Sequence, residues 1–87
     1  MIASVRFWRA IRACLPNTPA GRSLHAKLDA EPRQARKRHM PWPVDLTPAE
    51  DRLVRSLMDD PPTPYVAFVV QHHRLDALTK TRPTYAY

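Results

Sequence analysis

Residues 47–64 read TPAEDRLVRSLMDDPPTP, and this stretch contains the clearest helix signals in the chain. Thr47 and Glu50 have the spacing of a capping box, in which each side chain binds the backbone N–H of the other residue. Pro48 follows at the first helical position, where proline is well tolerated. The stretch therefore predicts a helix from Pro48 to about Asp59, because the two prolines that follow cannot continue it.

One face of this predicted helix is apolar. It carries Ala49, Leu53, Val54, Leu57 and Met58. A chain of 87 residues has little surface with which to cover such a face. We therefore expect Leu53 and Leu57 to dock against a partner.

A second helix signal follows directly, with Thr63 as the N-cap and Pro64 as the first helical residue. The next six residues, YVAFVV at 65–70, are apolar throughout and have high strand propensity. We favour a helix over a strand here because no other segment provides a partner strand. Apolar residues then surround the helix axis, which predicts burial on most sides, with Tyr65 and Phe68 among the docking residues.

The two predicted helices form an αα-hairpin over residues 47–80, followed by an extended tail at 81–87. A hairpin of this size is too small to build a robust core. We therefore expect it to be stable chiefly when it is docked on partners.

The first 15 residues, MIASVRFWRAIRACL, also have a helical pattern. Phe7, Trp8 and Ile11 gather on one side, three arginines gather on the other, and no acid occurs before Asp29. An amphipathic, arginine-rich and acid-free start is typical of a mitochondrial targeting helix. If the helix is retained, its apolar side docks on a partner through these three residues or covers the chain's own core.

Residues 16–46 are predicted to be an extended basic linker, broken by about two helical turns at 23–29. The linker contains a cluster of cations: Arg33, Arg36, Lys37 and Arg38. Arginine binds phosphate groups through paired hydrogen bonds, so we predict that these side chains contact a polyanion, either RNA or anionic lipid head groups. An acidic protein surface, or simple solvation, remains an alternative.

The distribution of charge supports a basic arm attached to a near-neutral module. The formal net charge is +6, with nine basic and two acidic residues in 1–40, against five basic and six acidic residues in 41–87. Ten prolines and one glycine favour short helices joined by extended segments, so the expected fold class is mostly α.

The sequence shows no motif that supports catalysis, cofactor binding or metal binding. A single glycine excludes a glycine-rich phosphate loop, and the only cysteine, Cys14, lies on an apolar helix face. His72 and His73 are adjacent, so on a helix they point in different directions and do not share one metal ion. The longest apolar run has six residues, whereas a membrane span needs about 20.

These observations predict a non-catalytic accessory subunit of a large mitochondrial inner-membrane complex, such as a respiratory-chain complex or the ATP synthase. The subunit is expected to brace neighbouring protein subunits and to lie in the matrix or at the inner membrane, with no small-molecule substrate. Its further partner is expected to be anionic, cardiolipin-like lipid. The alternative is a mitochondrial ribosomal protein that contacts rRNA through the basic cluster.

Overall fold

A computed structural model describes residues 1–33 and 41–81 of the chain, with side chains described through residue 78. The elements follow in the order β1 (Ile2–Ser4), α1 (Val5–Ala13), α2 (Pro19–Asp29), β2 (Pro41–Pro43), α3 (Pro48–Asp59) and α4 (Pro64–Thr81). The predicted mostly α class is confirmed, with a small two-stranded antiparallel sheet in addition. The extended tail was predicted for residues 81–87; Thr81 is instead the last residue of α4, and residues 82–87 lie outside the described residues.

Each helix described begins at a hydroxyl side chain. The hydroxyls of Ser4, Thr18, Thr47 and Thr63 each accept a hydrogen bond from the backbone N–H three residues further along the chain. At Thr47 the predicted capping box is confirmed, because the Thr47 N–H also donates to the Glu50 carboxylate over 2.9 Å. Both predicted C-terminal helices are therefore present, and the strand alternative for residues 65–70 is wrong.

The N-terminal segment differs from the single helix predicted for residues 1–15. Its first residues form β1, which pairs antiparallel with β2 so that Ala3 lies opposite Trp42. Backbone hydrogen bonds of 2.8 and 2.9 Å between Met1 and Val44 extend the pairing. The helical pattern could not reveal this pairing, since it depends on a segment about forty residues away.

The segment predicted as an extended linker, residues 16–46, contains a helix of 11 residues, α2, as well as β2. The prediction of about two helical turns at 23–29 was therefore too short. Thr18 caps α2 and Pro19 is its first residue, which is the same start signal as at Thr47. Gly21 is required where α2 begins, because a Cβ atom there would overlap the carbonyl oxygen of Pro16.

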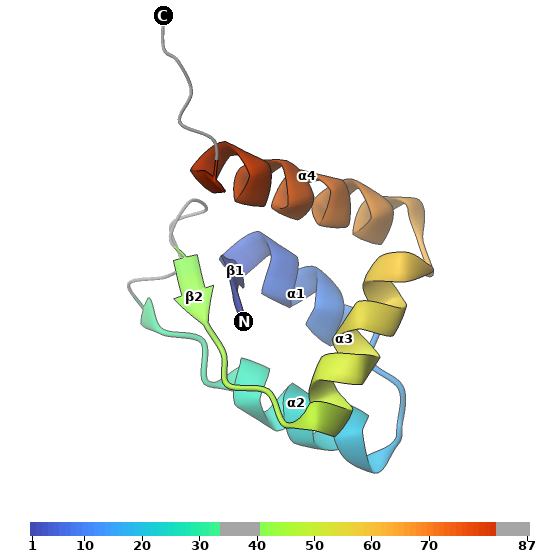
Figure 1. Ribbon diagram of the computed structural model, residues 1–87. Helices are drawn as coiled ribbons and strands as arrows, with labels where there is room; N and C mark the ends of the chain where they lie inside the picture. The colour runs from blue at the N-terminus through green and yellow to red at the C-terminus, as the bar shows by residue number, and fades with distance from the viewer. Residues whose placement is uncertain (34–40, 82–87) are drawn as a thin grey trace, which may run out of the picture.

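The predicted αα-hairpin is not confirmed. Figure 1 shows α1 in the middle of the molecule, with α4 along one side of it and α2 on the other. α4 packs mainly on α1, and α3 packs mainly on α2, while the contact between α3 and α4 is limited. The hairpin was predicted because helices joined by a short connection often pack on each other, whereas α4 makes most of its contacts with α1.

The chain forms its own hydrophobic core, to which all six elements contribute side chains. The buried apolar side chains are Ala3, Val5, Phe7, Trp8, Ala10, Ile11, Leu24, Leu28, Trp42, Val44, Val54, Val66, Val69 and Val70. The C-terminal helices, which were predicted to dock on partners, contribute Val54, Val66, Val69 and Val70 to this core. The N-terminal segment supplies the largest buried side chains and covers α4, while α3 packs mainly on α2.

Candidate docking surface

Three of the residues predicted to contact a partner are instead the centre of the core. Phe7, Trp8 and Ile11 are fully buried, each with 0% of its surface exposed. The Trp8 indole packs edge-on against Trp42, with ring centroids 6.4 Å apart, and its Nε1–H donates to the Trp42 carbonyl oxygen over 2.9 Å. The apolar side of the N-terminal helix therefore covers the chain's own core, and in this fold it is not available to a partner.

The arginine side of α1 is paired with acids from the end of α2 and the residues that follow it. Arg9 forms a two-point ion pair with Glu31, and Arg12 binds Asp29 over 2.7 Å. The hydrogen bond to Glu31 raises the pKa of Arg9, and the hydrogen bond from Arg12 lowers the pKa of Asp29. The fold thus gives a structural role to Arg9 and Arg12, two of the three arginines in the pattern that is typical of a targeting helix.

The two docking residues predicted on α3 are half-buried. Leu57 packs against the edge of the core. Val54, which lies between Leu53 and Leu57 in the sequence, is completely buried. Leu53 also lies partly exposed. Neither side chain presents a large free surface, so α3 contributes little to a docking surface.

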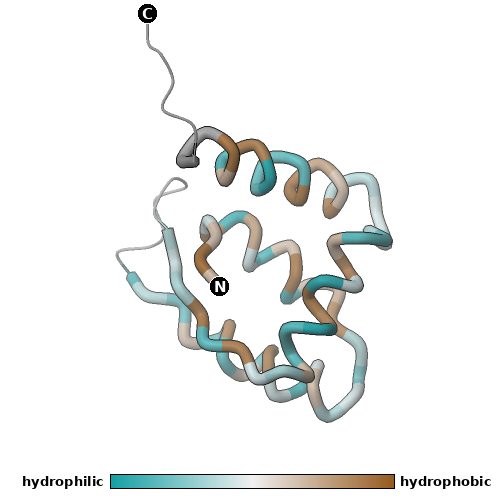
Figure 2. Tube along the Cα trace, viewed as in Figure 1, coloured by the Kyte–Doolittle hydropathy of each residue, from teal (hydrophilic) through white to brown (hydrophobic). Residues whose placement is uncertain are grey.

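Helix α4 differs from the other helices because it is apolar on two opposite sides. Val66, Val69 and Val70 face inward, with exposures of 2–3%. Tyr65 and Phe68 face outward and are 56% and 46% exposed. In the hydropathy view, hydrophobic segments recur along the length of α4, as expected for a helix with apolar residues all round its axis (Figure 2). The structure uses only one of the two apolar sides to cover α1.

The exposed side continues beyond the two predicted residues. His72 packs on Phe68 with ring centroids 4.4 Å apart, and Leu75 is 51% exposed. Tyr65, Phe68, His72 and Leu75 follow the spacing i, i+3, i+7 and i+10, which places them on one helix face. We call these four side chains the outer face of α4. His72 and Leu75 were missed in the sequence, although this spacing was the signal that could have found them.

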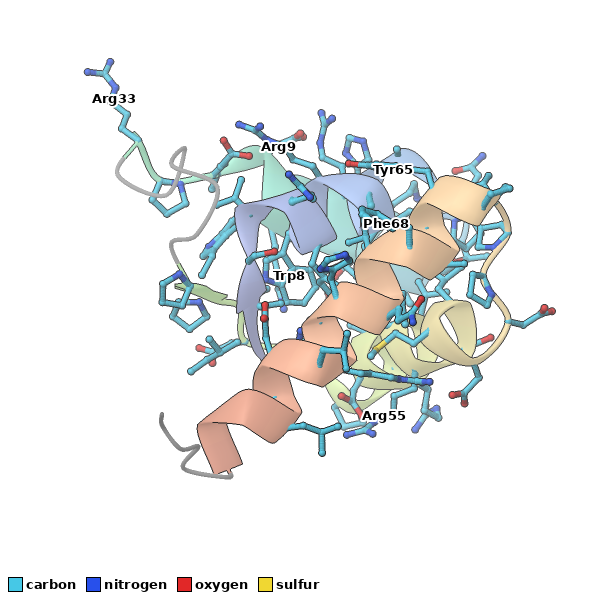
Figure 3. All side chains as sticks on the ribbon, turned by 90° about the horizontal axis from the view of Figure 1, so that it is seen from above. Trp8, Arg9, Arg33, Arg55, Tyr65 and Phe68 are labelled. Carbon is cyan, nitrogen blue, oxygen red and sulfur yellow. The ribbon has the colours of Figure 1, made fainter. Side chains whose placement is uncertain are left out.

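Few charges lie around the outer face. Among residues 65–78, α4 carries one arginine and one aspartate, Arg74 and Asp76. Arg74 binds Asp59 of α3 over 3.2 Å, which directs its charge away from the outer face. Figure 3 shows Arg9 of α1 and Tyr65 at the same edge of the molecule, and Arg55 at the opposite edge. The outer face therefore has a cation, Arg9, beside its N-terminal end and an anion, Asp76, near its C-terminal end.

A buried carboxylate, which the sequence identified only as a helix cap, also joins α2 to α3. Glu50 is 1% exposed and accepts hydrogen bonds from the Lys27 ammonium over 2.5 Å, from the Ser23 hydroxyl and from the Thr47 N–H. Burial alone would raise the pKa of Glu50, but these hydrogen bonds outweigh it and lower the pKa to about 2. Both carboxylate oxygens are engaged, so the group is suited to holding the two helices together rather than to accepting a proton from a substrate.

The other candidate residues have local structural roles. Cys14 is half-buried at the end of α1, its thiol donates to the Ile11 carbonyl oxygen, and burial raises its pKa, which favours the unreactive thiol form. His72 packs on Phe68, whereas His73 packs on Phe7 with centroids 4.6 Å apart. Adjacent histidines thus lie on different sides of α4, as predicted. Within residues 1–33 and 41–81, no group of acids, histidines or cysteine is arranged to hold a metal ion.

The basic cluster lies mostly outside the described residues. Arg33, its first member, is exposed, and it extends from a corner of the molecule in Figure 3. The other three members, Arg36, Lys37 and Arg38, fall in the segment between the described ranges. The chain is fixed on both sides of this segment, by the ion pair of Glu31 and by the burial of Trp42.

None of the helices in the described ranges is both long enough and apolar enough to span a membrane. Comparisons with known proteins gave no relative from which a function could be transferred: no family model, no curated protein and no solved structure matches the chain.

Proposed function

We propose that the chain is a non-catalytic subunit that joins a larger protein assembly through the outer face of α4. The observation that carries the proposal is the second apolar side of this helix, where Tyr65 and Phe68 are about half exposed although the core is already complete. Exposed aromatic side chains that gather on one face are typical of protein–protein contacts.

The low charge of this face favours a protein partner over a membrane surface or a nucleic acid. Helices that bind anionic lipid head groups, or surfaces that bind phosphates, carry a surplus of cations around their contact residues. The outer face has Asp76 beside it, and the nearby arginines, Arg9 and Arg74, are each paired with an acid. A protein partner that offers an apolar surface therefore fits the face better than a polyanion does.

The narrower form of the proposal is an accessory subunit of a mitochondrial inner-membrane complex that braces its neighbours. Its support is the arginine-rich, acid-free pattern at the start of the chain. Because α1 uses this pattern for the core and for two ion pairs, the support is weaker than the sequence alone suggested. Fractionation of cells that produce the chain tests the location, since recovery outside mitochondria contradicts it.

Replacing Phe68 by Asp is expected to release the chain from its assembly. A carboxylate in the centre of an apolar interface has to be desolvated without a partner, which costs several kcal/mol of binding free energy. On a density gradient of cell extract, the unmodified chain should sediment with a mass well above its own, and the Phe68→Asp variant should sediment as the free protein.

The matched control is Ser56→Asp, which adds the same charge to an exposed position of α3. The control should remain in the assembly, and circular dichroism should show that both variants are folded. Co-sedimentation of the Phe68→Asp variant at the original mass would contradict the proposal.

A second candidate function is contact with rRNA through the basic cluster. The observation that favours it is the exposure of Arg33, the first member of the cluster, together with the burial of Trp42 on the other side of the segment. A cationic segment held at both ends loses less conformational entropy when it binds phosphates than a free tail does. In this form the chain is a mitochondrial ribosomal protein.

Charge reversal at Arg36, Lys37 and Arg38 distinguishes the two functions. If rRNA holds the chain, this triple variant should be lost from the assembly, and nuclease or high salt should release the unmodified chain. If the outer face of α4 holds it, the triple variant should stay bound, and the Phe68→Asp variant should be released. Retention of the triple variant after nuclease treatment would contradict the ribosomal function.

A further inference from the structure

We propose that the molecule docked on the outer face of α4 is a second copy of this chain, whose α4 runs antiparallel to the first. The inference rests on the proposed function, because it names the partner that binds the same outer face of α4. A two-fold symmetric contact uses the same surface of both molecules, so the surface has to be complementary to itself. The outer face meets this requirement in shape and in charge.

The apolar side chains are arranged symmetrically about the middle of α4. In an antiparallel pair centred between residues 71 and 72, Phe68 of each copy lies opposite Leu75 of the other. An aromatic ring that is 46% exposed thus meets an aliphatic side chain that is 51% exposed, twice in the interface. His72, which already packs on Phe68, lies next to the symmetry axis and meets its own counterpart.

The charges beside the face favour the antiparallel orientation. Arg9 of α1 and Tyr65 lie at the same edge of the molecule (Figure 3). Asp76 lies on the same flank of α4 as Tyr65, 11 positions further along the helix. When the second copy runs in the opposite direction, its Asp76 and the Tyr65 of the first copy are about 3 Å apart, measured along the helix axis.

In that orientation each Asp76 carboxylate lies beside the Tyr65 hydroxyl and the Arg9 guanidinium of the other copy. A parallel pair instead leaves each Asp76 about 17 Å along the helix axis from the Tyr65 of the other copy, so this favourable contact is not formed. The low charge of the outer face also matters, because two molecules with a net charge of +6 each repel one another unless they meet on a neutral surface.

Disulfide cross-linking tests both the contact and its direction. Cys14 is first replaced by Ser, so that a single introduced cysteine is the only thiol. In the antiparallel pair the two copies of residue 72 lie within about 2 Å along the axis, whereas the two copies of residue 65 lie about 20 Å apart. A disulfide needs Cα atoms closer than about 7 Å. Oxidation should therefore link the purified His72→Cys variant into dimers and leave the Tyr65→Cys variant unlinked.

Sedimentation velocity of the unmodified full chain gives the oligomeric state. A dimer that dissociates at least tenfold more readily in the Phe68→Asp variant, with the Ser56→Asp control unchanged, supports the inference. Efficient linking of both cysteine variants would show a parallel pair and overturn the proposed direction.

A chain that stays monomeric at all concentrations, with no linking at residue 72, would overturn the inference altogether. The proposed function is tested separately by the gradient experiment. A monomeric chain whose Phe68→Asp variant still leaves the assembly would mean that a different protein occupies the outer face.

Discussion

Replacing Trp8 by Ala is expected to remove a large part of the protein's free energy of unfolding. Trp8 is fully buried in α1, and truncating a buried tryptophan to alanine costs about 3–5 kcal/mol through lost burial and the cavity left behind. The change also removes the donor that binds the Trp42 carbonyl oxygen, which adds about 1 kcal/mol. An ordinary domain of 87 residues has a free energy of unfolding of about 4–13 kcal/mol.

Urea unfolding followed by far-ultraviolet circular dichroism measures this loss, because it does not depend on tryptophan fluorescence. Trp8→Phe is the informative intermediate: it keeps most of the ring volume but loses the Nε1–H, and we expect it to cost less than half as much. All proteins are compared at one concentration, since dimerisation adds to apparent stability. A midpoint for Trp8→Ala equal to that of the unmodified chain would show that the core does not depend on α1.

Removing the charge of Glu50 is expected to lower the free energy of unfolding at neutral pH. The free energy of unfolding should then fall less steeply as the pH is lowered. The pKa of Glu50 is about 2 in the folded chain, against an ordinary value of 4.5. A carboxyl group with a lowered folded pKa stabilises the fold above its unfolded pKa, and this contribution is lost as the pH falls. The pH window therefore runs from about 4.5 down to about 2, and the contribution is about 3 kcal/mol.

Glu50→Gln keeps the shape of the side chain but leaves Lys27 without its buried partner. We expect its free energy of unfolding to fall by about 3 kcal/mol at pH 7 and to converge with that of the unmodified chain near pH 2. Asp60→Asn is the matched control, since it removes one exposed carboxylate at the end of α3 and should leave the curve nearly unchanged. Equal stabilities of the Glu50→Gln variant and the unmodified chain at pH 7 would contradict the role assigned to this ion pair.

The candidate site was only partly predictable. Tyr65 and Phe68 were expected to dock because they lie in an apolar run, and the structure leaves them exposed. Phe7 and Trp8 were expected to dock because they lie on the apolar side of an amphipathic helix, yet both are buried. An apolar pattern shows that a side chain is favourably buried, but it does not show whether the same chain or a partner buries it. Only the packing of α1 against α4 separates the two cases.

The ion pairs were hidden for a similar reason. Arg9 binds Glu31 and Arg12 binds Asp29 across separations of 22 and 17 residues, so no local spacing links them. Without these partners the arginines resemble a targeting helix or a nucleic-acid contact. The sequence shows which residues are charged, but only the turn between α1 and α2 places the arginines of α1 next to Asp29 and Glu31.

The sequence by itself determined where α3 and α4 begin and end, because a capping hydroxyl and proline act on the backbone hydrogen bonds of the next few residues. The tertiary structure alone decided which helices pack on each other, which apolar faces are buried, and how β1 finds β2. Apolar burial has no direction and acts between any two surfaces, so its outcome depends on the shape of the whole molecule. That is why one side of α4 covers α1 and the other side remains open to a partner.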